Sequence, residues 1–180
     1  MARKIAFILL IVACILWVGF IFSNSLDNGN ESGEKSAGVT EFVNKVAIAV
    51  GIEKTISHAF VRNMAHFVEF SVLALLSSAA IAVGIYPRVK IHLVYALLFS
   101  AISVPFSFII AVIDELIQKF FSTGRACQLT DVLLDTCGAL CGAALFALSY
   151  ILFTVIKDKC DKQRQKGLSH LARPKKSDNK

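Results

Sequence analysis

The chain has 180 residues, of which 56% are hydrophobic and only 18% are charged, and its formal net charge is +6. This composition excludes an ordinary soluble domain and a disordered chain, and it indicates a protein integral to a lipid bilayer. The positive charge does not indicate nucleic-acid binding, because residues 157–180 alone hold nine basic and three acidic residues and supply all of it.

Four apolar stretches are long enough to cross a hydrocarbon core, which takes about 20 helical residues. Because backbone groups in lipid must bond to one another, and these stretches lack the alternation of barrel strands, we predict helices. The predicted fold is all-α, a polytopic membrane protein with one four-helix transmembrane domain at 1–156 and a basic tail at 157–180. The predicted spans are residues 5–22, 64–85, 91–113 and 132–156.

An outer amphipathic helix is predicted between the first two spans. Residues 23–40 are polar and rich in Gly and Ser, and a turn rather than regular structure is expected there, at 27–30. From Val39 to Val50, apolar residues recur at helical spacing, whereas Glu41 takes another face. Such a helix either lies in the membrane interface or covers the mouth of the bundle.

The basic residues predict the orientation of the chain. Arg3 and Lys4 precede the first span, the second loop carries Arg88 and Lys90, and the tail is basic. Because Lys and Arg mark the cytoplasmic side, we predict that both termini are cytoplasmic. The ten acidic residues outside the tail then lie on the outer side or in the outer part of a span.

Polar stripes are predicted at the outer ends of three spans. Arg62, His66 and Glu69 share one face of the second span, because residues three or four apart lie on the same side of a helix. Ionisable groups at the edge of the hydrocarbon lose solvation and usually mark a working site, although structural ion pairing is the alternative. The third and fourth spans carry Asp114, Glu115, Gln118, Asp131 and Asp135.

Other positions complete the expected site. Arg125 follows the flexible Gly124 and can turn back toward the carboxylates with its rigid fork of donors. Gly138 and Gly142 form a small-xxx-small face for close helix packing. No metal or cofactor is expected, because the cysteines lack the companions of a zinc site.

Four segments carry a recognisable pattern: Phe22-Ser23-Asn24-Ser25, residues 62–70, the run from Asp114-Glu115-Leu-Ile-Gln118 to Gly124-Arg125, and then Asp131, Asp135, Gly138 and Gly142. Together they resemble the VanZ-like family of bacterial membrane proteins. The resemblance spans about residues 17–142, and it departs from the family at Ser25, where Gln is common, and at Asn63, where a second basic residue is common. It implies a protein of the bacterial cell membrane whose namesake is associated with resistance to the glycopeptide antibiotic teicoplanin, and it adds Ser23 to the polar cluster.

Three classes of function stay open, one of them enzymatic. The polar cluster could recognise a cell-envelope lipid, a lipid-linked precursor or an amphiphilic glycopeptide-type antibiotic and so affect antibiotic resistance. It could instead form an intramembrane hydrolase or transferase acting on an envelope lipid, in which Asp114 or Glu115 serves as general base or as metal ligand with His66. The candidate catalytic residues are then His66, Glu69, Asp114 and Glu115. A purely structural ion-pair network is the third class. Membrane lipids are the expected partners in every case.

Overall fold

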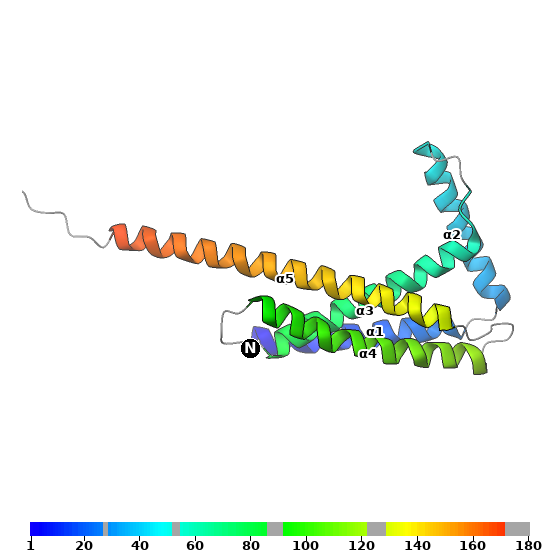
Figure 1. Ribbon diagram of the computed structural model, residues 1–180, viewed down its shortest axis with the longest axis horizontal. Coiled ribbons are helices and arrows are strands. Elements are labelled where there is room, and N and C mark those ends of the chain that lie inside the picture. The colour runs from blue at the N-terminus through cyan, green and yellow to red at the C-terminus, as the bar shows by residue number, and fades with distance from the viewer. Residues whose placement is uncertain (27–28, 52–54, 86–91, 122–128, 172–180) are drawn as a thin grey trace, which may run out of the picture.

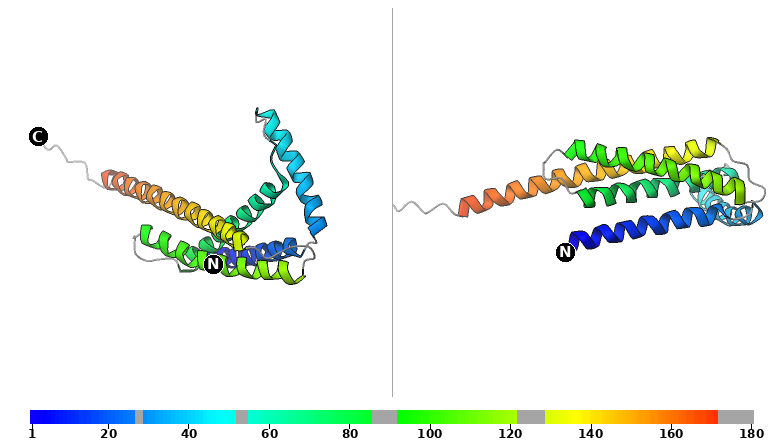
Figure 2. Two further views of the ribbon diagram at one scale, coloured as in Figure 1. Left: turned by 45° about the vertical axis from the view of Figure 1, so that its right-hand side comes forward. Right: turned by 90° about the horizontal axis from the view of Figure 1, so that it is seen from below.

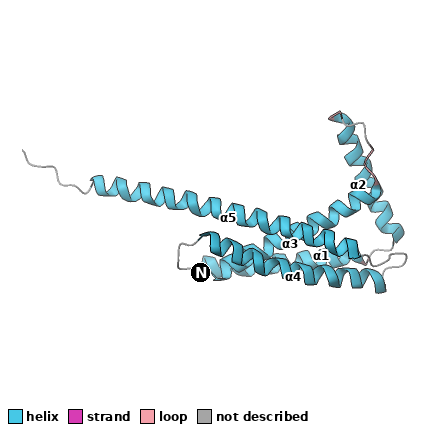
Figure 3. Ribbon diagram, in the orientation of Figure 1, coloured by secondary structure: helices cyan, strands magenta, loops and turns pink. Residues whose placement is uncertain are grey.

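The computed structural model describes residues 1–26, 29–51, 55–85, 92–121 and 129–171, with side chains left out at 29–36, 92 and 167–171. Within these ranges the regular structure is helical, as Figure 3 shows, and there is no strand. The predicted all-α class is therefore confirmed. The helices are α1 (Ala2–Ser25), α2 (Gly29–Ala49), α3 (His58–Ile85), α4 (His92–Phe121) and α5 (Leu129–Leu171).

Four helices, α1, α3, α4 and α5, are long and apolar enough to cross a membrane. The 24 residues of α1 extend over about 36 Å at 1.5 Å per residue, which exceeds a hydrocarbon core of about 30 Å. Figure 1 shows these helices side by side in one bundle, with successive spanning helices running in opposite directions along its horizontal axis. The end of α1 and the starts of α3 and α5 consequently lie at the same end of the bundle as the end of α4.

The helices are longer than the predicted spans. α3 begins at His58, and α4 continues through the polar residues after Ile113 to Phe121. Helical backbone therefore includes Arg62 and Asp114, which lie just outside the predicted spans. α5 continues to Leu171, past the predicted end of the domain at 156, and extends beyond the other helices in Figure 1.

α2 begins at Gly29, about ten residues before the amphipathic pattern starts at Val39, so the polar residues that precede Val39 within α2 are helical rather than irregular. Figure 2 shows α2 standing away from the four-helix bundle. It is tied to the segment before α3 by Asn44, whose Nδ2 donates to the Ile56 carbonyl (3.2 Å) and whose Oδ1 accepts from the Ile56 amide (2.8 Å).

The exposed surface of α2 combines charge with apolar groups. Glu41 and Lys45 form an exposed ion pair at 2.8 Å. Through this hydrogen bond and its positive charge, Lys45 lowers the pKa of the Glu41 carboxyl. Phe42 and Val46 are 67% and 47% exposed, so these two apolar side chains do not pack on the bundle, whereas Ala47 on the same helix is buried.

The core between the spanning helices is small and draws on all of them. It contains Ile21 of α1, Phe70 and Leu73 of α3, Ala111 of α4 and Val132 of α5. The Trp17 indole fastens α1 to α3 by donating to the Glu69 carbonyl oxygen (2.9 Å). Most other large apolar side chains face outward, as expected where lipid is the solvent.

Close contact between α3 and α5 depends on two glycines. A Cβ at Gly138 would collide with the carbonyl oxygen of Phe67, and one at Gly142 would collide with that of Ser71. The Ser71 hydroxyl uses the short separation to donate to the Gly138 carbonyl oxygen (2.8 Å) as well as to the Phe67 carbonyl oxygen (2.7 Å). Absence of side chains here lets the two backbones approach within hydrogen-bonding reach.

Candidate functional site

The end of α1 turns toward the interior of the bundle. Cys14, Ile21 and Ser25 are buried, and their spacings of seven and four residues place them on one face of a helix. Ser25 therefore points inward, whereas Ser23 is exposed and lies outside the contacts described below. Asn24 is half-buried and donates its Nδ2 to Oε1 of Glu69 (2.8 Å).

Asp114 is held from two helices. The Ser25 hydroxyl donates to its Oδ1 (2.5 Å), and Nε2 of Gln118 donates to its Oδ2 (2.9 Å). Gln118 also lies 3.2 Å from the Ser25 Oγ and donates to it. Asp114 has no exposed surface, so these hydrogen bonds replace the water that its carboxylate loses.

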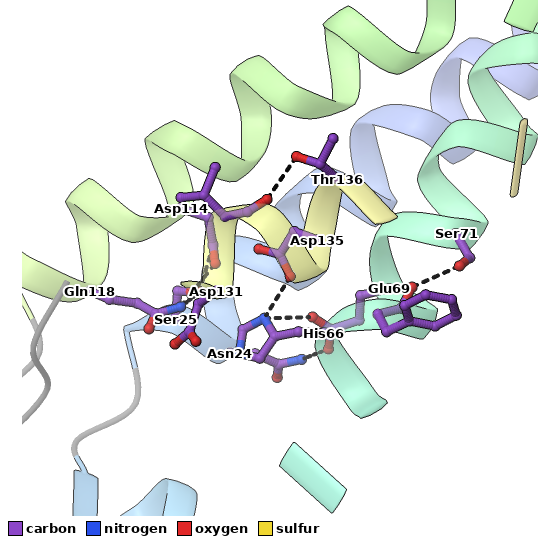
Figure 4. Close-up of polar contacts among 12 residues, drawn as sticks. Asn24, Ser25, His66, Glu69, Ser71, Asp114, Gln118, Asp131, Asp135 and Thr136 are labelled. Atoms are coloured by element: carbon purple, nitrogen blue, oxygen red, sulfur yellow. Dashed lines mark hydrogen bonds and ion pairs between the residues drawn. The ribbon is translucent and has the colours of Figure 1, made fainter. Parts of the chain in front are cut away.

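His66 lies between two carboxylates. Its Nδ1 is 3.9 Å from Oε2 of Glu69, one turn along α3, and 3.9 Å from Oδ1 of Asp135 on α5. Figure 4 shows the Asp135 carboxylate directed at the imidazole, with the Asn24 amide completing the contact to Glu69. The imidazole thus links the polar side chains of α3 and α5.

These contacts form one group, which we call the buried polar cluster. All four spanning helices contribute to it, so residues far apart in the sequence meet at one end of the bundle (Figure 4). Its members are Asn24 and Ser25 of α1, His66 and Glu69 of α3, Asp114 and Gln118 of α4, and Asp135 of α5.

The cluster is rich in negative groups. Glu115 is buried next to Asp114, and Asp131, half-buried in the first turn of α5, lies one turn before Asp135. Carboxylates gathered in a medium that excludes water need hydrogen bonds, protons or a cation for stability. The carboxyl groups whose charges act on Asp135 are those of Asp114, Glu115, Asp131 and Glu69.

Three side chains of the cluster are arranged as metal ligands could be. One ring nitrogen of His66 and one carboxylate oxygen each of Asp114 and Asp135 lie within 4.8 Å of one another. They come from α3, α4 and α5. From the sequence, His66 is paired with Asp114 or Glu115 as metal ligands in the enzymatic alternative, but Asp135 is not included, because these residues are distant in the chain and lack the short ligand spacing of familiar metal motifs.

Two arginines were also predicted to belong to the polar cluster, and the contacts described above include neither of them. Arg62 is half-buried and forms no ion pair among the residues that the structure describes. Arg125 lies outside the described residues.

From the sequence, Ser23 is the predicted cluster member of this segment, whereas the structure brings Asn24 and Ser25 into the cluster and leaves Ser23 exposed. The first span is apolar on every side, so the sequence carries no signal for the face that turns inward. The burial of Cys14 and Ile21 identifies that face, and continuing it by one turn reaches Ser25.

An apolar pocket of about 820 Å³ lies elsewhere in the bundle, between α1, α3 and α4. Its lining includes Phe7, Gly84 and Phe106, and also Arg3 and Lys4 from the N-terminal turn of α1. On each helix the core residues separate this lining from the polar cluster. The pocket therefore suits a hydrocarbon chain and is distinct from the cluster.

Comparison with known proteins identifies one match. Residues 10–153 match the family described as VanZ/LLP1, and this range includes every member of the buried polar cluster. No curated protein and no solved structure matches the chain.

Proposed function

Because the chain belongs to the VanZ/LLP1 family, we propose that it is a bacterial envelope protein that binds an amphiphile through the buried polar cluster. The ligand is an envelope lipid, a lipid-linked envelope precursor or a glycopeptide-type antibiotic, and its binding alters sensitivity to such antibiotics. With both termini in the cytoplasm, the cluster faces the outer leaflet, where these molecules are met.

One observation carries the proposal: all four spanning helices place polar side chains into a single buried cluster. Buried charged networks are often no more stabilising than apolar residues of the same volume. A bundle that needed only stability would be served by apolar contacts at this level. The concentration of carboxyl groups there therefore favours a working role.

The chemistry of the cluster restricts the ligand. Asp114, Glu115 and Glu69 offer acceptor oxygens to amide N–H and ammonium donors, which peptide-bearing precursors and glycopeptides carry. Apolar side chains that are exposed on the outside of the helices extend along the length of the bundle from the level of the cluster. An amphiphile can consequently place its head at the cluster and its tail along the bundle, parallel to the lipid chains.

The test compares drug sensitivity with membrane abundance in the same cells. Cells lacking the protein are complemented with the parent or with the double variant Asp114→Asn/Glu115→Gln, and their sensitivity to teicoplanin is measured. We expect the double variant to behave like the complete absence of the protein while its membrane level stays at that of the parent.

Glu41→Gln is the matched control, because it also removes a carboxylate but from the exposed surface of α2. It should keep the parental sensitivity. If the double variant loses both its effect on teicoplanin sensitivity and its membrane abundance, the cluster has a structural role. Full activity in the double variant would exclude these carboxylates from ligand binding.

A second function is favoured by the position of His66 between Glu69 and Asp135. A carboxylate beside an imidazole orients it and supports general-base catalysis. In this alternative the protein is an intramembrane hydrolase or transferase that acts on an envelope lipid, with Asp114 or Glu115 assisting. Turnover of a labelled lipid-linked precursor by the purified protein, lost in His66→Gln, would distinguish it from binding alone.

A further inference from the structure

We infer that His66, Asp114 and Asp135 form a binding site for one divalent transition-metal ion, with Zn²⁺ as the best-matched candidate. The ligand atoms come from three helices and lie within 4.8 Å of one another. An imidazole nitrogen with two carboxylate oxygens is a donor set that zinc accepts in proteins.

The distances allow an ion to be enclosed by small side-chain movements. Ligand atoms about 2.0 to 2.2 Å from Zn²⁺ lie roughly 3.3 to 3.6 Å apart in a tetrahedron. A separation of at most 4.8 Å therefore closes by up to about 1.5 Å, which rotation of the side chains supplies. The backbone of the bundle need not move.

Asp135 gives independent support for a bound ligand. The residue is 1% exposed, and its Oδ1 has no hydrogen-bond partner within the part of the chain that the structure describes. This oxygen is aimed into the group, 3.9 Å from Nδ1 of His66 (Figure 4). A buried carboxylate oxygen without a hydrogen bond is costly, and coordination to a cation is one way to satisfy it.

The surroundings match those of a metal site. Ser25 and Gln118 hold both carboxylate oxygens of Asp114 and so orient it, as outer-shell residues do around metal ligands. A divalent cation would also offset the negative charge that Glu69 and Glu115 add nearby. Three protein ligands leave a fourth position for water or for an oxygen of a bound molecule.

The test uses the purified full-length chain in detergent, without a histidine tag, after treatment with a chelator. Zn²⁺ alone is added, and binding is followed by calorimetry and by metal content after dialysis. Co²⁺ is the second probe, because its visible absorption reports nitrogen and oxygen coordination. We expect one ion per chain, and quenching of Trp17, the single tryptophan, by Co²⁺ because its indole bonds the Glu69 carbonyl.

Matched variants separate this site from other histidines. Asp135→Asn and His66→Gln should weaken Zn²⁺ binding about 100-fold or more, and Gln118→Ala should weaken it about 10-fold through loss of orientation. His58→Gln is the control, since His58 is an exposed histidine two turns earlier on the same helix, and it should bind like the parent. Melting curves show which variants keep the fold.

Equal Zn²⁺ affinity in the parent and in Asp135→Asn would overturn the inference, as would absence of stoichiometric binding to the parent. If His66→Gln fails to fold, the isosteric Asp135→Asn and the outer-shell Gln118→Ala still decide the matter. Because the probe is the metal alone, failure here would leave the proposed binding of an amphiphile untouched. Conversely, metal binding without any change in antibiotic sensitivity would contradict only the proposed function.

Discussion

Ser25, the last residue of α1, donates its hydroxyl to Asp114 of α4 over 2.5 Å, although 89 residues separate the two in the sequence. Both side chains are fully buried. This hydrogen bond closes the cluster on the α1 side. It makes the first helix part of the site rather than only an anchor.

Ser25→Ala is expected to destabilise the protein. The substitution leaves Oδ1 of Asp114 without its hydroxyl donor, and hydrogen bonds to charged groups contribute about 1.5 to 3 kcal/mol. Thermal unfolding in detergent, followed by circular dichroism, measures the change. Ser23→Ala is the control because Ser23 is exposed, and an equal loss in both variants would show that the effect is not due to Asp114.

Gly142→Ala should force α3 and α5 apart. Its new Cβ would meet the carbonyl of Ser71, which as backbone cannot move aside without shifting a helix. Overpacking of this kind costs about 1 to 3 kcal/mol, so the melting temperature should fall. Gly19→Ala on α1 has open space around its Cβ and should melt at the parental temperature or above.

The apolar side of α2 should lie in the membrane interface. The Phe42 side chain is 67% exposed, and burial of its ring in the membrane interface would remove this apolar surface from water. Spin labels at Phe42 and at Glu41 in vesicles should differ, with the label at position 42 more accessible to oxygen than to a water-soluble nickel complex. Equal accessibility at the two positions would place α2 in water.

The orientation of the bundle is testable with reporters. A fusion after Lys180 and an insertion within residues 86–90, which the sequence predicts to connect the second and third spans, should both report a cytoplasmic location, because basic residues are retained on that side. Activity of a periplasmic or extracellular reporter at either position would reverse the expected orientation. It would then place the buried polar cluster in the inner leaflet.

Hydropathy alone determined the spanning helices, because a backbone in lipid must satisfy its own hydrogen bonds and an apolar run of sufficient length can do so only as a helix. The stripe of His66 and Glu69 was equally visible, since the period of a helix assigns residues three apart to one face. Helix ends were less predictable. α3 and α4 continue into polar residues, where hydropathy gives no boundary but helical hydrogen bonding persists.

Only the tertiary structure decided which stripes meet. A helical period defines the face on which Asp135 lies but says nothing of the neighbour that the face contacts or of its depth in the bundle. Those depend on the close approach of α3 and α5 at Gly138 and Gly142, and on the rotation of α1 that turns Ser25 rather than Ser23 inward. The meeting of His66, Asp114 and Asp135 follows from that packing, because each comes from a different helix and no local spacing connects them.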